Sequence, residues 1–174
     1  MFVAQKLRRQ SVSAYLIYMY QVEDLVRAYA LDAERIAAEY LPRFGYDEAQ
    51  LAQAQAWYDS LCRMMHEEGK EQTGHLQVVQ NTIDLLEESH RERLADEDNR
   101  AYSAAYYKAL PFIVELRSQG NNKEKSEMEN CIDALYGAAI LGMQGKEVTA
   151  GTKTALAAIS QLLRLGEEEA QAQA

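Results

Sequence analysis

The sequence contains little that would break a helix or build a sheet. Its 174 residues include only two prolines and nine glycines, and β-branched residues do not alternate with polar residues as they do along strands. Long tracts are instead rich in alanine, leucine, glutamate and glutamine, which favour helices. The fold class that this composition predicts is all-α, a single-domain bundle of six or seven helices.

Cysteine is also scarce, because Cys62 and Cys131 are the only two and no CxxC pair is present. Both stand beside apolar residues in helical patterns, as reduced and buried thiols do. This usage favours a reducing compartment, and we expect a cytoplasmic protein. A chain of this length buries roughly 70% of its unfolded surface, so we expect no cofactor to be needed for folding.

Long apolar runs and an excess of positive charge are missing too. No segment approaches 18 uncharged apolar residues, so we expect no membrane span. The run AYLIYMY at 14–20 ends at Glu23 and Asp24 without a cleavage site, so we expect the mature protein to begin near Met1. The formal net charge of −9 opposes a phosphate backbone, and we expect no nucleic-acid partner.

The segment 12–29, VSAYLIYMYQVEDLVRAY, has the strongest helical pattern in the chain. At about 100° per residue, its aliphatic and tyrosine side chains cover about half of the helix circumference, which exceeds the single stripe of a surface helix. We expect this helix to be central. Glu23, Asp24 and Arg27 gather on or beside its polar side, where they mark a possible polar site. An ion pair between Glu23 and Arg27, four residues apart, is the favoured interpretation.

Capping residues and apolar spacing divide the chain into seven expected helices. They run from residue 3 or 11 to 30, then over 32–42, 47–68, 73–94, 96–117, 123–144 and 149–165. Asp32 and Asp47 are the expected caps of the second and third, and Gln50 completes a capping box with Asp47. The helical domain should span residues 1–166, and the acidic tail EEEAQAQA at 167–174 should be disordered.

Histidines supply the main candidates for metal binding. Glu87 and His90 have the ExxH spacing of carboxylate-bridged dinuclear sites, but the sequence has no second ExxH pair. His90 also falls on the apolar face of its predicted helix, so a core histidine with a hydrogen-bond partner is favoured. His66 and His75 flank the loop EEGKEQTG, with His75 in the first turn of the helix 73–94. We therefore assign no metal site, and His90, Glu87 and His75 remain candidates.

Motifs for nucleophilic catalysis and phosphate binding are missing, so we assign no catalytic residue. Four segments nevertheless resemble a known family: YQVEDLVRA at 20–28, GHLQ at 74–77, YYKALPFIVELR at 106–117 and ALYG at 134–137. They resemble small all-helical bacterial proteins described only as a domain of unknown function. The resemblance implies a helical fold and a cytoplasmic location, and it brings no catalytic residues.

These observations lead us to expect a non-enzymatic helical interaction or scaffold protein that self-associates. A homo-oligomer is expected because a bundle with spare apolar surface tends to cover it with a symmetric partner. The alternative is a metal- or small-molecule-binding bundle that uses His90, Glu87 and His75, with Glu23 or Asp24. The sequence does not identify its ligand.

Overall fold

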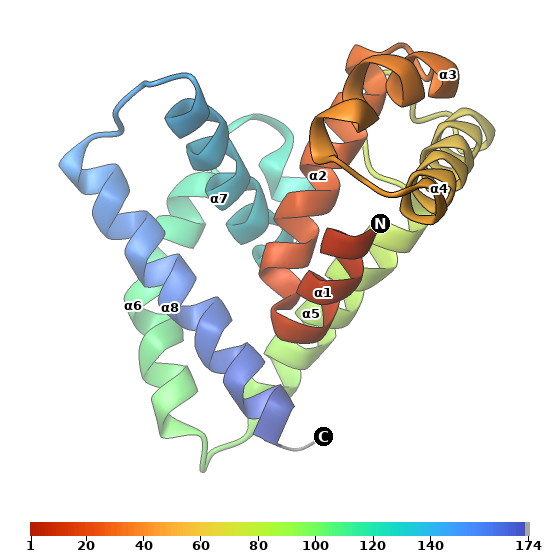
Figure 1. Ribbon diagram of the computed structural model, residues 1–174. Helices are drawn as coiled ribbons and strands as arrows, with labels where there is room; N and C mark the ends of the chain where they lie inside the picture. The colour runs from red at the N-terminus through yellow and green to blue at the C-terminus, as the bar shows by residue number, and fades with distance from the viewer. Residues whose placement is uncertain (173–174) are drawn as a thin grey trace. The chain divides into compact units, whose positions relative to one another are not determined.

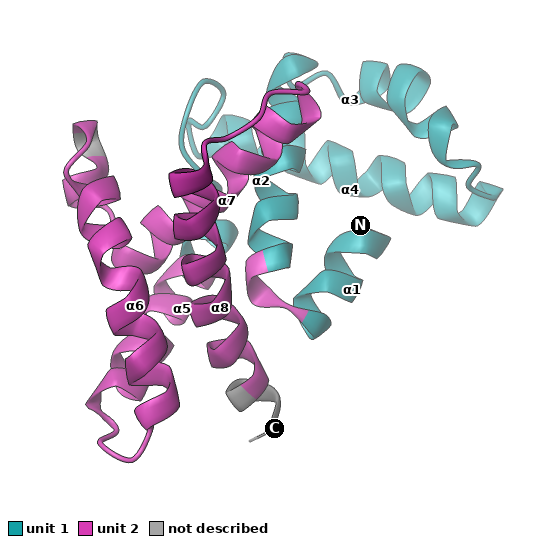
Figure 2. Cartoon of the chain, turned by 90° about the vertical axis from the view of Figure 1, so that its left-hand side faces the viewer, with its two compact units in different colours: residues 1–10, 14–81 teal, residues 11–13, 82–174 magenta. Residues whose placement is uncertain are grey.

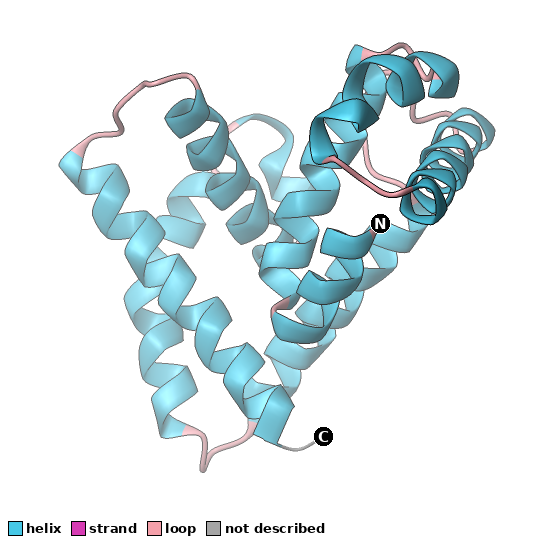
Figure 3. Cartoon of the chain, in the orientation of Figure 1, coloured by secondary structure: helices cyan, strands magenta, loops and turns pink. Residues whose placement is uncertain are grey.

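The structure is a computed structural model that describes residues 1–172, and over these residues it is helical with no strand (Figures 1 and 3). Its α-helices are α1 (Phe2–Gln10), α2 (Val12–Ala28), α3 (Ala33–Arg35), α4 (Glu48–Glu67), α5 (Gln77–Ala95), α6 (Arg100–Arg117), α7 (Glu127–Met143) and α8 (Ala150–Ala172). Three short segments of other helix types are the π-helix η1 (Ile36–Tyr40) and the 3₁₀ helices η2 (Leu41–Phe44) and η3 (Gly120–Glu124). The all-α prediction is confirmed, with eight helices in the described part instead of six or seven.

Of the two starts expected for the first long helix, residues 3 and 11, the second agrees with α2, which begins at Val12, just after Ser11, a residue type that favours helix starts. Residues 2–10 form the separate helix α1. One predicted helix end is wrong. The last helix does not end at Gly166 but continues to Ala172, so the tail predicted as disordered is helical over residues 167–172. Residues 173 and 174 lie outside the described residues.

Two contacts, one of Gly166 and one of Glu167, explain why α8 continues past Gly166. Gly166 lies against the ring of Tyr102, and a Cβ at this position would be 3.3 Å from a ring carbon. Because glycine has no Cβ, α8 can pack closely on this ring without ending. The next residue, Glu167, accepts a hydrogen bond of 2.7 Å from the backbone N–H of Ser13. The carboxylate that we expected in solvent therefore has a structural partner.

The chain divides into two compact units (Figure 2). Unit 1 comprises residues 1–10 and 14–81, and unit 2 comprises residues 11–13 and 82–174. Helix α5 begins in unit 1 and continues in unit 2. The single helical domain expected over residues 1–166 stays a prediction.

Unit 1 is built around the apolar and aromatic face of α2. The buried side chains of this helix are Tyr15, Leu16, Met19, Tyr20, Val22, Glu23 and Val26. Helix α4 adds the buried side chains of Ala54, Tyr58, Leu61, Cys62 and Met65. The broad face predicted for α2 is therefore buried within a single copy of the chain, and one carboxylate lies inside it.

The connection from α2 to α3 has an uncommon backbone. Ala30 and Leu31 are both left-handed, with φ of 53° and 59°, a conformation that costs roughly 1–2 kcal/mol for each non-glycine residue. In this conformation the N–H of Leu31 donates to the carbonyl of Val26 at 2.9 Å and closes the end of α2. Asp32 then caps α3 by accepting the N–H of Arg35 at 2.9 Å, which confirms the predicted cap.

The start of α4 is set by local sequence. The side chain of Asp47 accepts the N–H of Gln50 at 2.8 Å, and the side-chain oxygen of Gln50 accepts the N–H of Asp47 at 3.2 Å. These reciprocal bonds form the predicted capping box.

In unit 2, helix α6 packs against α7 and α8. The side chains that it buries are Tyr102, Ala105, Ala109 and Ile113. From α8 the buried side chains are Ala158, Ile159, Leu162 and Leu163. Alanines at the centre of the buried face let the neighbouring helices approach closely. Another face of α6 stays exposed and carries Tyr107 and Val114.

Replacing Asp47 by alanine should lower the free energy of unfolding by about 1 kcal/mol, because it removes the cap of α4. Urea denaturation of the two proteins measures this difference. Gln53→Ala, on the exposed side of the same helix, is the control and should change stability by less than about 0.5 kcal/mol. Equal effects of the two substitutions would contradict a capping role for Asp47.

Candidate functional site

The polar site predicted on α2 forms a cluster with the segment that leads into α5. Glu23 has a completely buried side chain, and its Oε2 lies 2.6 Å from Nδ1 of His75. Its Oε1 accepts the backbone N–H of Leu76 at 2.8 Å. The ring of His75 in turn stacks on Tyr20, with 3.8 Å between ring centroids. We call Glu23, Arg27, His75 and Tyr20 the Glu23 cluster.

Arg27 holds the same segment from the next turn of α2. Its Nε donates to the carbonyl of Lys70 at 3.2 Å, and its Nη2 donates to the carbonyl of Gly74. Its ion pair is with Asp24, at 2.9 Å, and not with Glu23 as we expected. The reason is that Glu23 faces inward, where His75 and Leu76 occupy both of its oxygens.

The Glu23 cluster has a structural role at the start of α5. That helix begins at Gln77, so His75 lies just before it and not in its first turn, as we predicted. A second carboxylate, Glu68, accepts the N–H of Gln77 at 2.6 Å. Negative charge at a helix N-terminus is favourable because the free N–H groups and the helix dipole are positive there. The cluster thus fixes the loop at residues 68–76 on α2.

The ExxH pair on α5 lies in unit 2 and forms a second polar cluster. His90 is almost completely buried, with Nδ1 2.8 Å from the hydroxyl of Tyr102 and Nε2 3.7 Å from Oε2 of Glu127. This confirms the prediction of a core histidine with a hydrogen-bond partner. Burial lowers the pKa of His90, although Glu87 and Glu127 act in the opposite direction. The imidazole is therefore neutral at pH 7.

Glu87 connects the ExxH pair to the start of α7. Its Oε2 accepts the N–H of Met128, in the first turn of that helix, at 3.1 Å. Its Oε1 accepts Nε of Arg91 at 3.0 Å. Both carboxylate oxygens of Glu87 are thus engaged in hydrogen bonds within the fold. Ser126 completes the helix start by accepting the N–H of Glu129.

A cavity of about 240 Å³ opens beside these residues. It is lined by Glu87, His90, Arg91, Leu94, Tyr106, Arg117, Ser126 and Glu127. Nη1 of Arg117 lies 3.4 Å from Oε1 of Glu127. Nε of Arg117 and Oε2 of Glu127 are buried and have no hydrogen-bond partner among the described residues. Burial, and next the interaction with Glu127, raise the pKa of Tyr106 to about 12, so its hydroxyl stays protonated.

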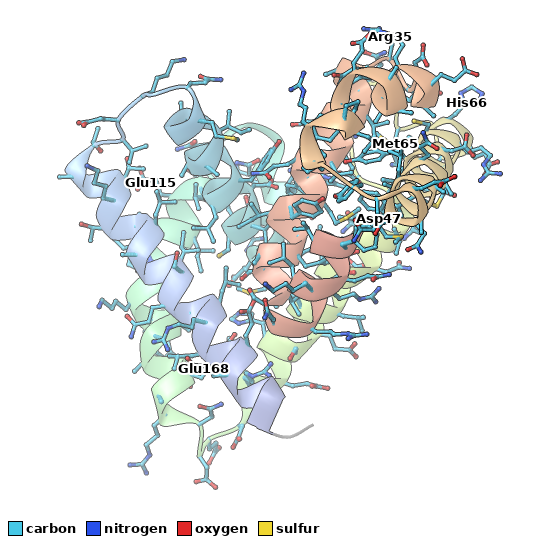
Figure 4. The ribbon with its side chains drawn as sticks, in the orientation of Figure 1. Arg35, Asp47, Met65, His66, Glu115 and Glu168 are labelled. Carbon is cyan, nitrogen blue, oxygen red and sulfur yellow. The ribbon has the colours of Figure 1, made fainter. Side chains whose placement is uncertain are left out.

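The metal candidates do not form a ligand set. Among the side chains that the structure describes, no group of three or more His, Cys, Asp or Glu could hold a metal ion. His75 belongs to unit 1, whereas Glu87 and His90 belong to unit 2. His66 is exposed on the surface of α4 (Figure 4), with Nδ1 3.0 Å from Glu71.

The cysteines are free and buried, as predicted. Burial raises the pKa of the Cys131 thiol to about 12 and also raises that of Cys62. A nucleophilic cysteine needs a lowered pKa, so neither thiol is set up for catalysis.

Sequence reasoning missed the contribution of Tyr106, Arg117 and Glu127 to the cavity in unit 2. Arg117 ends α6 and Glu127 begins α7, so the two belong to different helices that meet only after folding. It also missed an alanine-lined groove in unit 1, with cavities of about 420 and 630 Å³ that share Ala33, Glu34 and Asp59. Spacing along one helix cannot reveal either feature.

The fold and clusters described above define an all-helical protein without an assigned catalytic centre. Residues 1–172 match a family described as a domain of unknown function (DUF4924), and the chain belongs to that family. The resemblance found from the four sequence segments is thereby confirmed. No curated protein and no solved structure matches the chain. Within the described residues, no helix is long and apolar enough to cross a membrane.

Replacing Glu23 by alanine should lower the free energy of unfolding by about 3 kcal/mol, because it leaves the partly buried ring of His75 and the buried N–H of Leu76 without their acceptor. Chemical denaturation measures the loss. Asp24→Ala is the matched control, since Asp24 is the neighbouring residue but is half exposed, and it should cost less than about 1 kcal/mol. A similar cost for both changes would show that the buried carboxylate does not organise the loop.

The imidazole of His90 should titrate with a midpoint below 6.5, its ordinary pKa. NMR measurement of its ring protons against pH tests this. The pKa of His90 is about 6.5 in the unfolded chain and lower in the native protein, so the unfolded chain binds a proton first as the pH falls. The contribution of this difference to the free energy of unfolding is therefore full above pH 6.5. It is lost as pH falls toward the native pKa. Glu127→Gln should lower the midpoint further, and a midpoint above 6.5 would refute the argument.

Proposed function

We propose that this chain is a non-enzymatic helical interaction protein that pairs with a second copy of itself through α6. The observation that supports the proposal is an exposed stripe on this helix, formed by Ala104, Tyr107, Pro111 and Val114. Tyr107 and Val114 are 68% and 58% exposed, which is unusual for large apolar side chains on one stripe. We call these four residues the α6 stripe.

The α6 stripe has the spacing of a helix-pairing surface. Its residues follow one another at intervals of three, four and three, which is the alternation of the a and d positions in a coiled coil. This seam lies on α6 away from the buried Ala105, Ala109 and Ile113. The helix can therefore pack within unit 2 and still present a second face to a partner.

Charges beside the α6 stripe favour a second copy in antiparallel orientation. Lys108 and Glu115 are exposed, stand seven residues apart and lie on the same flank, at equivalent e positions. In an antiparallel pair with twofold symmetry, residues on the same flank of the two helices face each other. An axis near Pro111 then places Lys108 of each copy opposite Glu115 of the other. The surface is thus complementary to itself, as a symmetric interface requires.

The broad face of α2 no longer supports self-association, although it first suggested it. Its large side chains are buried or half-buried within one copy of the chain. The α6 stripe supports self-association instead, because its side chains remain exposed.

We also infer that the protein acts in the cytoplasm and without nucleic acid. Two buried free cysteines suit a reducing compartment. The net charge of −9 disfavours binding to a phosphate backbone.

Sedimentation velocity at micromolar to near-millimolar concentration tests the proposal. The wild-type chain should dimerise, and Val114→Glu should shift it to monomer, because a charge would then be buried in the seam. Leu85→Glu is the control, since Leu85 is an exposed leucine of unit 2 that lies on α5. It should leave the dimer unchanged. A wild-type chain that stays monomeric throughout this range would eliminate self-association.

A charge exchange tests the antiparallel arrangement. Lys108→Glu should weaken the dimer, because each introduced carboxylate faces Glu115 of the other copy. The double change Lys108→Glu with Glu115→Lys should restore it. Failure of the double change to restore the dimer would rule out this pairing.

A further inference from the structure

Exposed apolar side chains gather at one place in unit 1, where the start of α1 meets the connection from η2 to α4 (Figure 1). Phe2 lies against Tyr46, with 5.6 Å between ring centroids, and Tyr46 stacks on Phe44 at 5.3 Å. Gly45, with a left-handed φ of 61°, turns the chain between the two stacked rings. Phe44 is 46% exposed and Val3 is 44% exposed, so the fold leaves aromatic and aliphatic surface uncovered here.

Basic side chains lie on the same face of α1. At about 100° per residue, two apolar and two basic residues fall within an arc of about 120°, namely Phe2, Val3, Lys6 and Arg9. The buried Ala4 points to the opposite side, toward the core of unit 1. Lys6 and Arg9 are exposed and form no ion pair with any side chain that the structure describes. Two positive charges therefore stand free beside the apolar surface.

Arg43 adds a third positive charge from the neighbouring segment. It directly precedes Phe44, and its guanidinium lies 5.8 Å from the ring centroid of Tyr40. Tyr40 in turn contacts Phe44 edge-on, with 5.0 Å between ring centroids. We use the name α1 patch for the surface formed by Phe2, Val3, Lys6, Arg9, Arg43 and Phe44.

The charge at the α1 patch is opposite in sign to that of the whole chain. Residues 1–10 and 43–48 contain four basic residues and two acidic ones, whereas the chain has a net charge of −9. The two acidic residues are Asp47, which caps α4, and Glu48. At physiological ionic strength, exposed charges are screened beyond about 8 Å. The groups at the surface of contact therefore determine what the α1 patch attracts.

We propose that the α1 patch binds the surface of a membrane that contains anionic lipids. The basic side chains contact lipid phosphates, and the exposed Phe44 and Val3 enter the boundary between headgroups and acyl chains. Each kind of side chain then meets its complement, whereas an acidic protein would satisfy only the cations. Binding at the surface needs no helix that crosses the bilayer. The α1 patch belongs to unit 1 and is independent of the α6 stripe.

Sedimentation of the full chain with lipid vesicles tests the proposal. The vesicles contain phosphatidylcholine with about 30% phosphatidylserine, in about 0.1 M salt. The chain should bind these vesicles. Its binding to phosphatidylcholine alone should be at least about tenfold weaker, because the basic side chains then lose the excess negative charge of the surface.

Charge reversal tests the basic part of the α1 patch. Lys6→Glu with Arg9→Glu should weaken binding at least about 25-fold, because each basic residue near an anionic surface contributes roughly fivefold. Lys146→Glu with Lys153→Glu is the matched control, since both lysines are exposed in unit 2 and lie outside the α1 patch. It changes the net charge by the same amount and should leave binding within about twofold of the wild type.

Removal of apolar side chains tests insertion into the lipid. Phe44→Ala should weaken binding roughly tenfold, because it removes a ring from the apolar contact. Leu85→Ala is the control, since Leu85 is an exposed leucine on α5 in unit 2, and it should bind like the wild type. Circular dichroism checks that each variant keeps its helix content. Val3→Ser replaces Phe44→Ala as the test of insertion if the latter alters the fold.

Four results would overturn the proposal. One is the lack of binding to the vesicles that contain phosphatidylserine, and another is equally tight binding to phosphatidylcholine alone. The third is an equal loss of binding in the two charge-reversed proteins. The fourth is wild-type binding by the folded variants that lack an apolar side chain. If poly-glutamate also binds the wild-type chain as tightly as the vesicles do, this fourth result assigns the α1 patch to an acidic protein partner.

Discussion

The buried carboxylate of Glu23 is the constraint on which the arrangement of unit 1 depends. An ion removed from water costs several kcal/mol unless donors surround it, and here the donors are His75 and the backbone N–H of Leu76. Both belong to the chain just before α5. The requirement of one side chain on α2 therefore determines where the loop at residues 68–76 lies and where the next helix begins. Tyr20 covers the histidine and completes the enclosure.

Carboxylates from distant parts of the sequence also accept backbone N–H groups at two other helix starts. Glu87 accepts the N–H of Met128 at the beginning of α7, and Glu167 accepts the N–H of Ser13 at the beginning of α2. In each case a carboxylate from a distant part of the sequence completes a helix terminus, which also places negative charge at the positive end of the helix dipole. Glutamates that look like surface residues in the sequence are thus part of the tertiary structure.

This difference between local and distant caps explains which features the sequence predicted. Asp32 and Asp47 cap helices within three residues, and both were predicted correctly. The start of α5 was placed at residue 73 instead of 77, because its cap, Glu23, lies 53 residues before Leu76. His90 was recognised as a buried histidine from its place on an apolar face. Its partners Tyr102 and Glu127 depend on how α5, α6 and α7 pack, which one helix does not reveal.

The distant caps also imply an order of events as the chain folds. The caps of α3 and α4 are available as soon as their own turns form, on the microsecond scale of helix formation. The first turn of α5 acquires Glu23 only after a long segment has closed, and the first turn of α2 acquires Glu167 only after nearly the whole chain is present. Contacts between residues this far apart in sequence form slowly. The N-terminal turns of α2 and α5 should therefore mature after the body of each helix.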